Sequence, residues 1–530
     1  MKRRDFLINA GIGGVFPSLI NGFPIKAIGL SPVLQALANT AVETNHVLVI
    51  IQLNGGNDGL NMVLSLDQQY DNLKVARANI LMDKSKILKL NGVDATGLHP
   101  AMTDMQNMFN NGTLKIIQGV SYPQPNFSHF RATDIWLTGA DSTQVLTSGW
   151  QGRYLQNEYA NYPTGFPNNT MPDPLAIQIS STLSTAFQGN SGPMGITISN
   201  PTALYNFVNN VEDPAPSGNI GKELTYLRTI ERQSQQYGTV IKTAFTKGAN
   251  LAIYPKAGTN GLADQLQIVA RLIKGGLKTR VYMVNTGGFD NHANQVNAAD
   301  FTIGTHANLL GALSLAIGTF QSDLEKLGLK DRVLGMTFSE FGRRIKSNAS
   351  LGTDHGAALP MFVFGASLHG GVLGTNPIIP ASATVNDNVS MQYDFRSVYA
   401  SLLKDWFCAS DTDLQSILLK NYQTLPIVNS ASCVSTDVHD INVAAGKSII
   451  NPYPNPFTFG VTIDFETFGG HTSVQIFDTE GHLMATPVDG EYAVGKYKVW
   501  YNGGHLPNGV YYTRLQNGAI QQVKAMVKVN

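Results

Sequence analysis

Short apolar runs alternate with amphipathic stretches along most of the chain. Apolar residues dominate four runs, at residues 46–53, 114–120, 280–285 and 332–338, and each run is followed by polar, glycine or proline residues. Runs of this length and composition are typical of strands that are buried on both faces of a sheet. The pattern therefore predicts a buried strand at each of these four places.

Helical periodicity lies between these runs. Apolar residues recur at helical spacing over residues 307–327 and stop at Gly328, and similar stripes cover residues 262–273 and 394–407. Strands that alternate with helices predict a doubly wound α/β sheet. Residues 147–219 are rich in Asn, Pro, Ser and Gly. For this segment we expect long loops with little regular structure, of the kind that forms a lid.

The pattern changes near the C-terminus. From residue 446 to residue 530 apolar and polar residues alternate with a period of two, which predicts a small all-β sandwich. The dipeptide Asn517-Gly518 is a strong signal for a hairpin turn within it. We therefore expect an α/β domain over residues 46–426, a linker over residues 427–445 and the sandwich over residues 446–530.

Charge and cysteine content narrow the class of protein. The 530 residues include 37 basic and 37 acidic side chains, and only 14% of the chain is charged. This balance argues against a polyanion-binding protein, so we expect no nucleic-acid partner. Low charge with 52 glycines suits an exported, loop-rich protein. The two cysteines, Cys408 and Cys433, either form one disulfide after export, or Cys408 is a core residue near a helix end.

The first 38 residues have the features of an export signal. Lys2-Arg3-Arg4 precede an apolar stretch over residues 6–30, and "ALA" at residues 36–38 has the form of a cleavage site. The paired arginines resemble a twin-arginine signal. An ordinary secretory signal or an N-terminal anchor is the alternative. No later stretch of about 20 uninterrupted apolar residues predicts a membrane span.

Polar side chains follow the four predicted strands where each strand ends. Parallel strands present their carboxyl ends at one edge of a sheet, which is where open α/β sheets bind ligands. Carboxylates and neutral histidines suit Zn, Mn or a similar divalent ion, one or two of them. A metal can activate a serine hydroxyl, and an arginine can hold two oxygens of a phosphate or sulfate ester. The candidate metal ligands are Asp58, Asp290, His292, Glu340, Asp354 and His355, and the candidate catalytic residues are Ser128 and Arg343.

Some of these residues also have structural explanations. Ser128 directly precedes a helical pattern, so a helix N-cap explains it equally well as a nucleophile does. Glu340 and Arg343 are spaced for a structural ion pair. His99 and His306 are more often structural than metal ligands, and we assign neither to the site. Ser128 also lacks a G-x-S-x-G setting, which argues against a serine acyl hydrolase with a nucleophile elbow.

Residues 47–407 resemble a large uncharacterised family of exported bacterial proteins, a domain of unknown function that often has a twin-arginine signal and is sometimes labelled sulfatase-like. The resemblance rests on "LVIIQLNGGNDGLNMV", "NFSHFRATDIWLTG", "GGFDNHANQ", "TFSEFGRRIKSNASLGTDHGAA" and "DFRSVYASLLKDW". The family is grouped with the alkaline phosphatase-like superfamily. The resemblance therefore implies a mostly parallel sheet between helices, with a divalent-metal site at its carboxyl edge.

The same resemblance implies roles for several residues. Asp58 matches the superfamily's first-strand metal carboxylate, and Ser128 stands where the nucleophile is expected. Asp290 with His292 resembles a metal-binding pair, Glu340 stands where an Asp-His pair usually follows a strand, and His355 resembles the final histidine ligand.

The chain also departs from the superfamily pattern. The spacing from Asp290 to His292 is short, Phe341 replaces an expected histidine, and Ser128 lacks the Cys-x-Pro-x-Arg setting of classical sulfatases. The departures favour a single metal, or altered ligands that include Asp354.

The C-terminal sandwich resembles the sorting domain of the type IX secretion system. The resemblance rests on "NPYPNPF" at residues 451–457, "LPNGVYYTRL" at residues 506–515 and the closing "VKAMVKVN". It implies the type IX machinery as a partner and export through the periplasm to the cell surface or the extracellular space. A generic adhesive β-sandwich is the alternative.

The expected function is thus an exported metal-dependent hydrolase of phosphate or sulfate esters, with Ser128 as nucleophile and Arg343 as anion clamp. A small molecule or a glycan ester would be its substrate. The alternative is a catalytically inactive binding or structural protein of the cell surface on the same scaffold.

Overall fold

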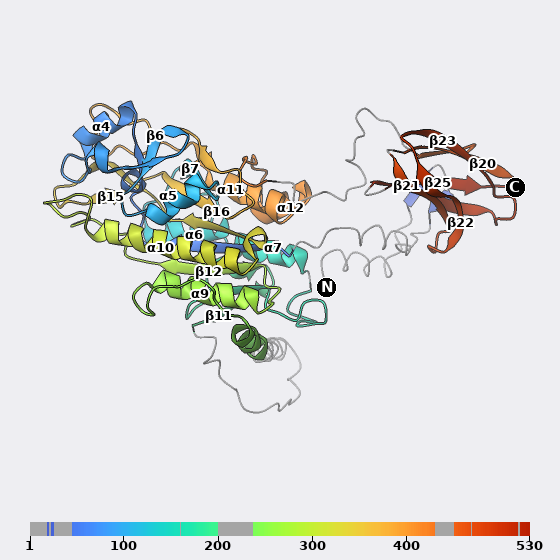
Figure 1. The fold of residues 1–530 in the computed structure, drawn as a ribbon, viewed down its shortest axis with the longest axis horizontal. Coiled ribbons are helices and arrows are strands. Elements are labelled where there is room, and N and C mark those ends of the chain that lie inside the picture. The colour runs from blue at the N-terminus through green and yellow to red at the C-terminus, as the bar shows by residue number, and fades with distance from the viewer. Residues whose placement is uncertain are drawn as a thin grey trace. The chain divides into compact units, whose positions relative to one another are not determined.

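The computed structural model describes residues 45–159, 161–199, 237–429, 450–467, 469–517 and 520–530, together with the backbone of two short strands, β1 (Ser18–Ile20) and β2 (Phe23–Ile25). Apart from these two strands, the expected export signal lies outside the described residues, as does most of the expected linker. The chain divides into two units (Figure 1), and each is described by itself.

The first unit is built around a nine-stranded sheet. Strand β16 is antiparallel to both of its neighbours, and the other pairings in the sheet are parallel. The predicted mostly parallel sheet is therefore confirmed. Its order is β11 (Ile196–Ile198), β8 (Ala176–Ile179), β12 (Val281–Thr286), β3 (Val47–Leu53), β13 (Val333–Phe338), β16 (Leu359–Phe364), β7 (Leu114–Ser121) and β17 (Gly371–Leu373), with β18 (Tyr393–Asp394) also paired to β7.

Both faces of the sheet are buried by helices. Along β3, Leu48 and Ile50 belong to one apolar cluster, whereas Val49 and Ile51 belong to another. Because side chains alternate across a strand, the two clusters lie on opposite faces. The first cluster includes residues of α6 (His129–Thr138), α7 (Trp150–Glu158) and α11 (Phe395–Ser401), and the second includes residues of α5 (Thr103–Asn110), α9 (Gly261–Lys274) and α10 (Thr305–Lys326).

The four predicted strands and three predicted helices are all present, with small shifts at their ends. The third helix is α11, which continues into a π-helical turn, η4 (Leu402–Trp406). The expectation of little regular structure over residues 147–219 is wrong for the part up to residue 199, because this part contributes α7, β8 and β11; residues 200–219 lie outside the described residues. The two strands have four and three residues, and strands this short give little periodic signal among Pro, Ser and Gly.

Smaller elements complete the first unit. A hairpin of β14 (Arg343–Ser347) and β15 (Thr353–His355) follows β13. A separate three-stranded sheet contains β4 (Val63–Ser65), β5 (Leu88–Leu90) and β6 (Val93–Leu98). The remaining elements are α3 (Gly59–Met62), α4 (Gln68–Ala76), η1 (Lys84–Lys86), η2 (Thr185–Phe187), β9 (Gln188–Gly189), β10 (Gly192–Pro193), a helix over 237–247, η3 (Lys330–Arg332) and α12 (Asp411–Leu418).

The first unit extends slightly beyond its expected end at residue 426. Ile427 and Val428 are buried, Val428 forms an isolated bridge with Leu368, and the Asn429 backbone N–H donates to Ser367. Cys408 is disulfide-bonded, and the only other cysteine of the sequence, Cys433, lies outside the described residues. Within the described ranges, no helix is long and apolar enough to cross a membrane.

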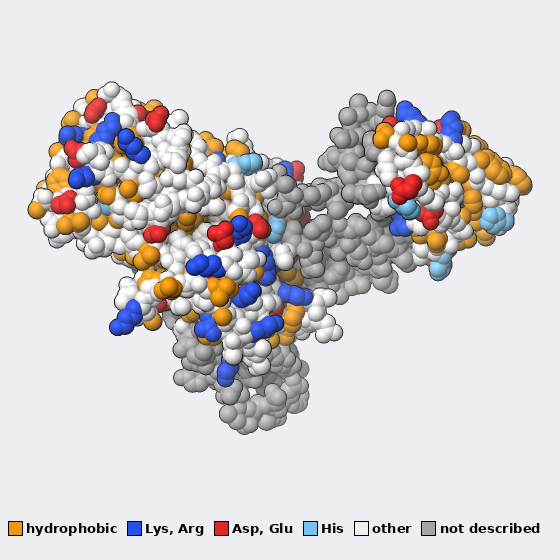
Figure 2. Space-filling model, viewed as in Figure 1, with side chains coloured by type: hydrophobic (Ala, Val, Ile, Leu, Met, Phe, Trp, Pro, Cys, Tyr) orange, Lys and Arg blue, Asp and Glu red, His pale blue; other side chains and the backbone are white. Residues whose placement is uncertain are grey.

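The second unit is the predicted all-β sandwich. One antiparallel sheet contains β19 (Ile450–Tyr453), β20 (Gly460–Thr467) and β23 (Gly495–Asn502), and the other contains β21 (Gly470–Phe477), β22 (Leu483–Tyr492), β24 (Gly509–Asn517) and β25 (Ile520–Lys528). Alternate residues such as Ile463, Ile476 and Leu515 form one apolar core. Asn517 pairs with Ile520 across the predicted hairpin. Apolar side chains also lie on the surface of this unit, on the face drawn in Figure 2.

Candidate metal centre

The loops that follow β12, β3 and β13 meet at one edge of the sheet, because these strands are neighbours. The loop after β12 carries Asp290, and Glu340 comes directly after Ser339 at the end of β13. The backbone N–H of Gly55, in the loop after β3, donates to Glu340 Oε1 at 2.8 Å. The expected meeting of strand ends is therefore present in the structure.

Two glycines allow these loops to pack closely. Gly55 and Gly56 have φ values of +120° and +72°, which side-chain-bearing residues rarely adopt. A Cβ atom on Gly55 would lie 2.4 Å from the Asp290 nitrogen, and one on Gly56 would lie 2.2 Å from the Phe341 ring. The Asn-Gly-Gly sequence after β3 therefore fixes the position of the Asp290 loop and of Phe341.

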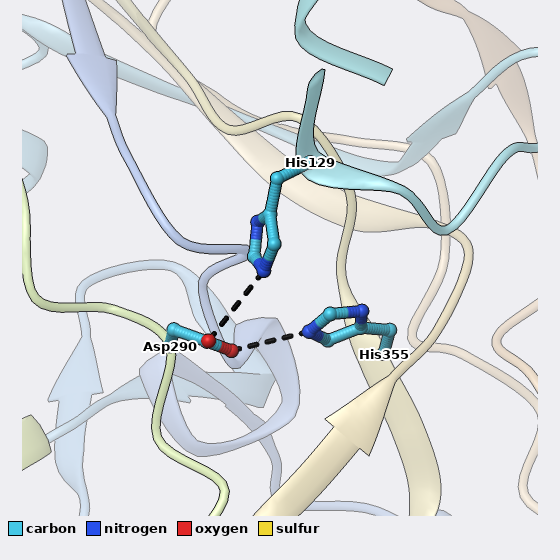
Figure 3. Close-up of side chains that lie close together, drawn as sticks. All are labelled: His129, Asp290 and His355. Carbon is cyan, nitrogen blue, oxygen red and sulfur yellow. Dashed lines mark hydrogen bonds and ion pairs between the residues drawn. The ribbon is translucent and has the colours of Figure 1, made fainter. Parts of the chain in front are cut away.

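Three histidines surround the Asp290 carboxylate. Nε2 of His292 and Nε2 of His355 each lie 3.1 Å from Oδ1, and Nε2 of His129 lies 3.5 Å from Oδ2. Figure 3 shows His129, at the start of α6, and His355, at the end of β15, pointing toward Asp290 from different parts of the chain. His129, Asp290 and His355 are spaced so that they could hold a metal ion, and His292 lies beside this group, in contact with Asp290.

The opposite nitrogen of each histidine faces an oxygen atom. Nδ1 of His355 lies 2.9 Å from the Phe127 carbonyl, Nδ1 of His129 lies 2.8 Å from Glu340, and Nδ1 of His292 lies 3.0 Å from Asp354. A carbonyl or carboxylate oxygen accepts hydrogen bonds, so Nδ1 is the protonated nitrogen in each ring. In the neutral form of each ring, Nε2 then presents a lone pair toward Asp290. Metal-binding histidines in proteins are oriented in this way.

The contacts among these atoms favour a cation between them. Nε2 of His292 lies only 2.9 Å from Nε2 of His355, so the two nitrogens cannot both carry protons. Ligand atoms bound to one zinc ion at about 2.0–2.1 Å are about 3.3–3.4 Å apart in tetrahedral geometry and about 2.8–3.0 Å apart in octahedral geometry. The distances of 2.9–3.1 Å among these two nitrogens and Asp290 Oδ1 are close to these ranges. The residues present therefore fit a divalent ion.

Charge and burial favour the metal-binding forms of Asp290 and His355. Burial raises the pKa of Asp290, but the hydrogen bond and charge of Arg343 outweigh this effect and lower the pKa to about 2. Burial lowers the pKa of His355, so its ring is neutral near pH 7. The Asp290 side chain is 45% exposed, so the centre is accessible from solvent.

Glu340 and Asp354 lie behind the histidines. Glu340 is buried, and its Oε1 atom accepts hydrogen bonds from His129 and from the Gly55 backbone, while Ser339 donates to its Oε2 atom. Asp354 accepts from His292 and Asn348. The structure places both carboxylates, which are expected as ligands, against the Nδ1 atoms of His129 and His292.

The structure does not bring Asp58 to this cluster. Its carboxylate is buried, and it accepts hydrogen bonds from Arg77 at 2.6 Å and 2.9 Å and from Gln295 at 2.6 Å. Burial raises the pKa of Asp58, but the charge of Arg77 outweighs it and the net shift is downward. The Arg77 guanidinium is thus the cation beside Asp58, which leaves one candidate ion site at this edge among the described residues.

Arg343, the expected anion clamp, is buried among the loops of the site. Its side chain is buried, and its guanidinium donates to the carbonyls of Gly56 and Thr353, at 2.5 Å and 2.7 Å, and to that of Gly55. Its Nη2 atom also lies 2.6 Å from Asp290 Oδ1. Arg343 therefore ties the loops to Asp290, and its side chain is fully buried by these contacts.

Ser128 is exposed at the N-cap position of α6, but its side chain makes no capping hydrogen bond. Among the described residues its hydroxyl forms no hydrogen bond, and His129 is the next residue. His129 is a candidate ligand that the sequence analysis does not single out, although its place directly after Ser128 in "NFSHFR" is a usable signal. His99 and His306 are buried away from the cluster, with His306 Nε2 lying 2.9 Å from Asn57 Oδ1.

Residues 85–405 match the profile of a family described as protein of unknown function, DUF1501. The chain belongs to this family. Residues 451–529 match the secretion system C-terminal sorting domain, which indicates export to the cell surface or the extracellular space. No curated protein shows significant similarity to the chain.

Three solved structures illustrate the wider similarities. The PsFucS1 sulfatase from Pseudoalteromonas sp. is 10% identical over 88% of this chain and 86% of its own, with a TM-score of 0.33. BT33494S-sulf from Bacteroides thetaiotaomicron is 9% identical over 91% and 89%, with a TM-score of 0.32. PorZ, a type IX secretion component of Porphyromonas gingivalis, is 24% identical over 15% of this chain and 11% of its own, with a TM-score of 0.13. At these TM-scores the similarities carry no argument about chemistry.

Proposed function

We propose that this protein is an exported, metal-dependent hydrolase of phosphate or sulfate esters. The observation that carries the proposal is the convergence of three histidine Nε2 atoms on the Asp290 carboxylate, with each Nδ1 atom held by an oxygen. The proposed ligands of one zinc or manganese ion are His129, Asp290, His292 and His355.

Such an ion, when bound, lowers the pKa of a nearby hydroxyl and offsets negative charge on an ester. Ser128 is the proposed nucleophile, because its exposed hydroxyl stands beside the ligand His129 at the positive end of α6. Its oxygen would lose a proton to solvent and attack the phosphorus or sulfur atom, while the alcohol leaves and takes up a proton. Attack by water would then release the inorganic anion and restore the serine hydroxyl.

The surrounding residues would preserve this arrangement. Glu340, Asp354 and the Phe127 carbonyl hold the three imidazole rings in the orientation that presents Nε2. Arg343 keeps Asp290 ionised and ties it to the loop after β3. The histidines and the carboxylate therefore need little rearrangement to bind an ion.

One observation favours the rival function, a binding protein without catalysis. Among the described residues, no base accepts a hydrogen bond from the Ser128 hydroxyl, so no side chain is in place to receive its proton. A metal-bearing protein of this kind would bind a glycan or another ligand tightly without turnover.

Elemental analysis of the purified full chain, beside Asp290→Ala and His355→Ala variants, tests the metal site. We expect near-stoichiometric divalent metal in the wild type and loss of it in both variants. Turnover of aryl phosphates and sulfates by the metal-loaded protein, abolished by Ser128→Ala with metal content unchanged, would support the hydrolase. Metal without turnover of either ester would favour the binding protein, and no metal after soaking with zinc or manganese would reject both.

We further propose that the C-terminal unit delivers the chain to the type IX secretion machinery. The sorting-domain match and the exposed apolar side chains of this unit, among them Phe459, Val494 and Trp500, support this step. The twin-arginine-like N-terminus would serve the earlier passage into the periplasm. Deletion of residues 446–530 should retain the protein in the periplasm, and secretion of the shortened chain would contradict the proposal.

A further inference from the structure

Arg344, which lies close to the candidate metal centre, has guanidinium N–H groups without hydrogen-bond partners among the described residues. Arg343 pairs with His355 across the β14–β15 hairpin, and Arg344 is the next residue along the strand. The pairing is irregular between Arg343 and Ser347, and Arg344 is half-buried whereas Arg343 is fully buried. The Arg344 guanidinium lies over the ring of Phe127, 5.2 Å from the ring centroid.

Phe127 connects this guanidinium with the proposed reaction site. Its carbonyl accepts the hydrogen bond from His355 Nδ1, and the next residue is Ser128. One aromatic residue is therefore in contact with a proposed metal ligand through its backbone and with Arg344 through its ring. This stacking also limits the freedom of a long side chain that would otherwise be mobile in solvent.

The guanidinium groups of Arg343 and Arg77, at the same edge, already form hydrogen bonds within the protein. Arg343 and Arg77 are buried, and each donates to carbonyls and to a carboxylate. Arg344 is half-buried and has a hydrogen bond from Nη1 to the Asn386 carbonyl. Its Nε and Nη2 atoms have no hydrogen-bond partner in the part of the chain that the structure describes. No carboxylate there lies within ion-pair distance of it, although its charge helps to lower the pKa of Asp387.

We propose that Arg344 binds a negatively charged, tetrahedral group of the substrate. This inference rests on the proposed ester hydrolase and names the residue that would take over the anion-binding role that Arg343 does not fill. A guanidinium presents parallel N–H donors that match two oxygens of a phosphate or a sulfate. The free donors of Arg344 fit this role, and its stacking on Phe127 holds it over the residue that precedes Ser128.

Binding of inorganic phosphate and inorganic sulfate to the zinc-loaded full chain tests the inference. Isothermal titration at fixed ionic strength would compare wild type, Arg344→Met and Arg344→Lys. Methionine keeps apolar contact with Phe127 but lacks charge, whereas lysine keeps the charge but lacks the planar donors. Lys346→Met is the matched control, because Lys346 is an exposed cation two residues further along the same strand.

We expect Arg344→Met to weaken binding of at least one anion tenfold or more, Arg344→Lys to weaken it less, and Lys346→Met to leave it unchanged, all with unchanged zinc content. Equal binding by wild type and Arg344→Met would overturn the inference, as would no binding of either anion by wild type. A wild type that binds anions through Arg344 but turns over no ester would reject the hydrolase and keep the anion site. Arg344-dependent binding of phosphate alone or sulfate alone would name the anion.

Discussion

Replacement of Gly56 by alanine should damage the metal centre through Phe341. A Cβ atom at Gly56 would lie 2.2 Å from the Phe341 ring, and ordinary contact needs at least 3.4 Å, so the ring would have to move by about 1.2 Å. Phe341 is buried, and its ring centroid lies 5.0 Å from that of His129 and 4.4 Å from that of His355. The displaced ring would therefore press on two proposed metal ligands.

The size of the effect can be separated from backbone strain. Gly92 has a φ of +74°, almost the same as the +72° of Gly56, but a Cβ atom there would meet nothing within 4 Å. Both alanine variants bear a left-handed backbone cost of about 1–2 kcal/mol. Gly56→Ala adds overpacking of about 1–3 kcal/mol. We also expect it to weaken zinc binding tenfold or more, while Gly92→Ala should bind zinc like wild type.

Urea unfolding of the zinc-free full chain, followed by tryptophan fluorescence, would measure the stability difference. Trp136, Trp150 and Trp406 are buried in the first unit, whereas Trp500 of the second unit is exposed, so the signal reports mainly on the first unit. Titration of zinc against a competing chelator would measure affinity. Equal unfolding midpoints and equal zinc affinities for Gly56→Ala and Gly92→Ala would refute the reasoning.

Three further predictions concern charge at the site. Glu340→Gln should weaken zinc binding by about 10–100-fold, because the carboxylate orients His129. Competition for zinc with a chelator measures this affinity. A loss no larger than that of the control variant Glu325→Gln, at an exposed position, would contradict the prediction. Asp58→Asn should lower the free energy of unfolding by about 3–5 kcal/mol at pH 7, because it leaves Arg77 buried without its partner. The pKa of Asp58 is lower in the folded state than its usual 3.8. The contribution of the Asp58 carboxylate to the free energy of unfolding is therefore fully present above about pH 4 and is lost as the pH falls through the folded-state pKa. The urea unfolding midpoints of wild type and variant should converge as the pH is lowered below about 4. Zinc affinity of the wild type should fall between pH 8 and pH 5 as protons compete for the three Nε2 atoms, and a flat profile in chelator competition would count against histidine ligation.

The sequence allowed the main strands and the general location of the site to be predicted. Buried strands such as Val47–Leu53 and Val333–Phe338 have continuous apolar runs, and adjacent parallel strands must present their ends together. The short strands Ala176–Ile179 and Ile196–Ile198 were missed, because three or four residues give no clear period against a background of loop-forming residues.

The roles of individual side chains were harder to predict, because they depend on which way each one points. Arg343 and Arg344 are adjacent in the sequence, yet only the first is buried against the loops. Asp58 has the expected position after a strand, but its partner is Arg77, 19 residues further along. Pairings of this kind arise from packing in three dimensions, and local spacing does not encode them.

The β14–β15 hairpin gathers several of the proposed tasks in one short stretch. Its thirteen residues, from Arg343 to His355, include the anchor of Asp290, the proposed anion-binding residue, the carboxylate that orients His292 and a proposed metal ligand. The hairpin can therefore be replaced as one segment. Grafting the corresponding hairpin from a relative would alter metal affinity and anion preference together, while the strands of the central sheet stay unchanged.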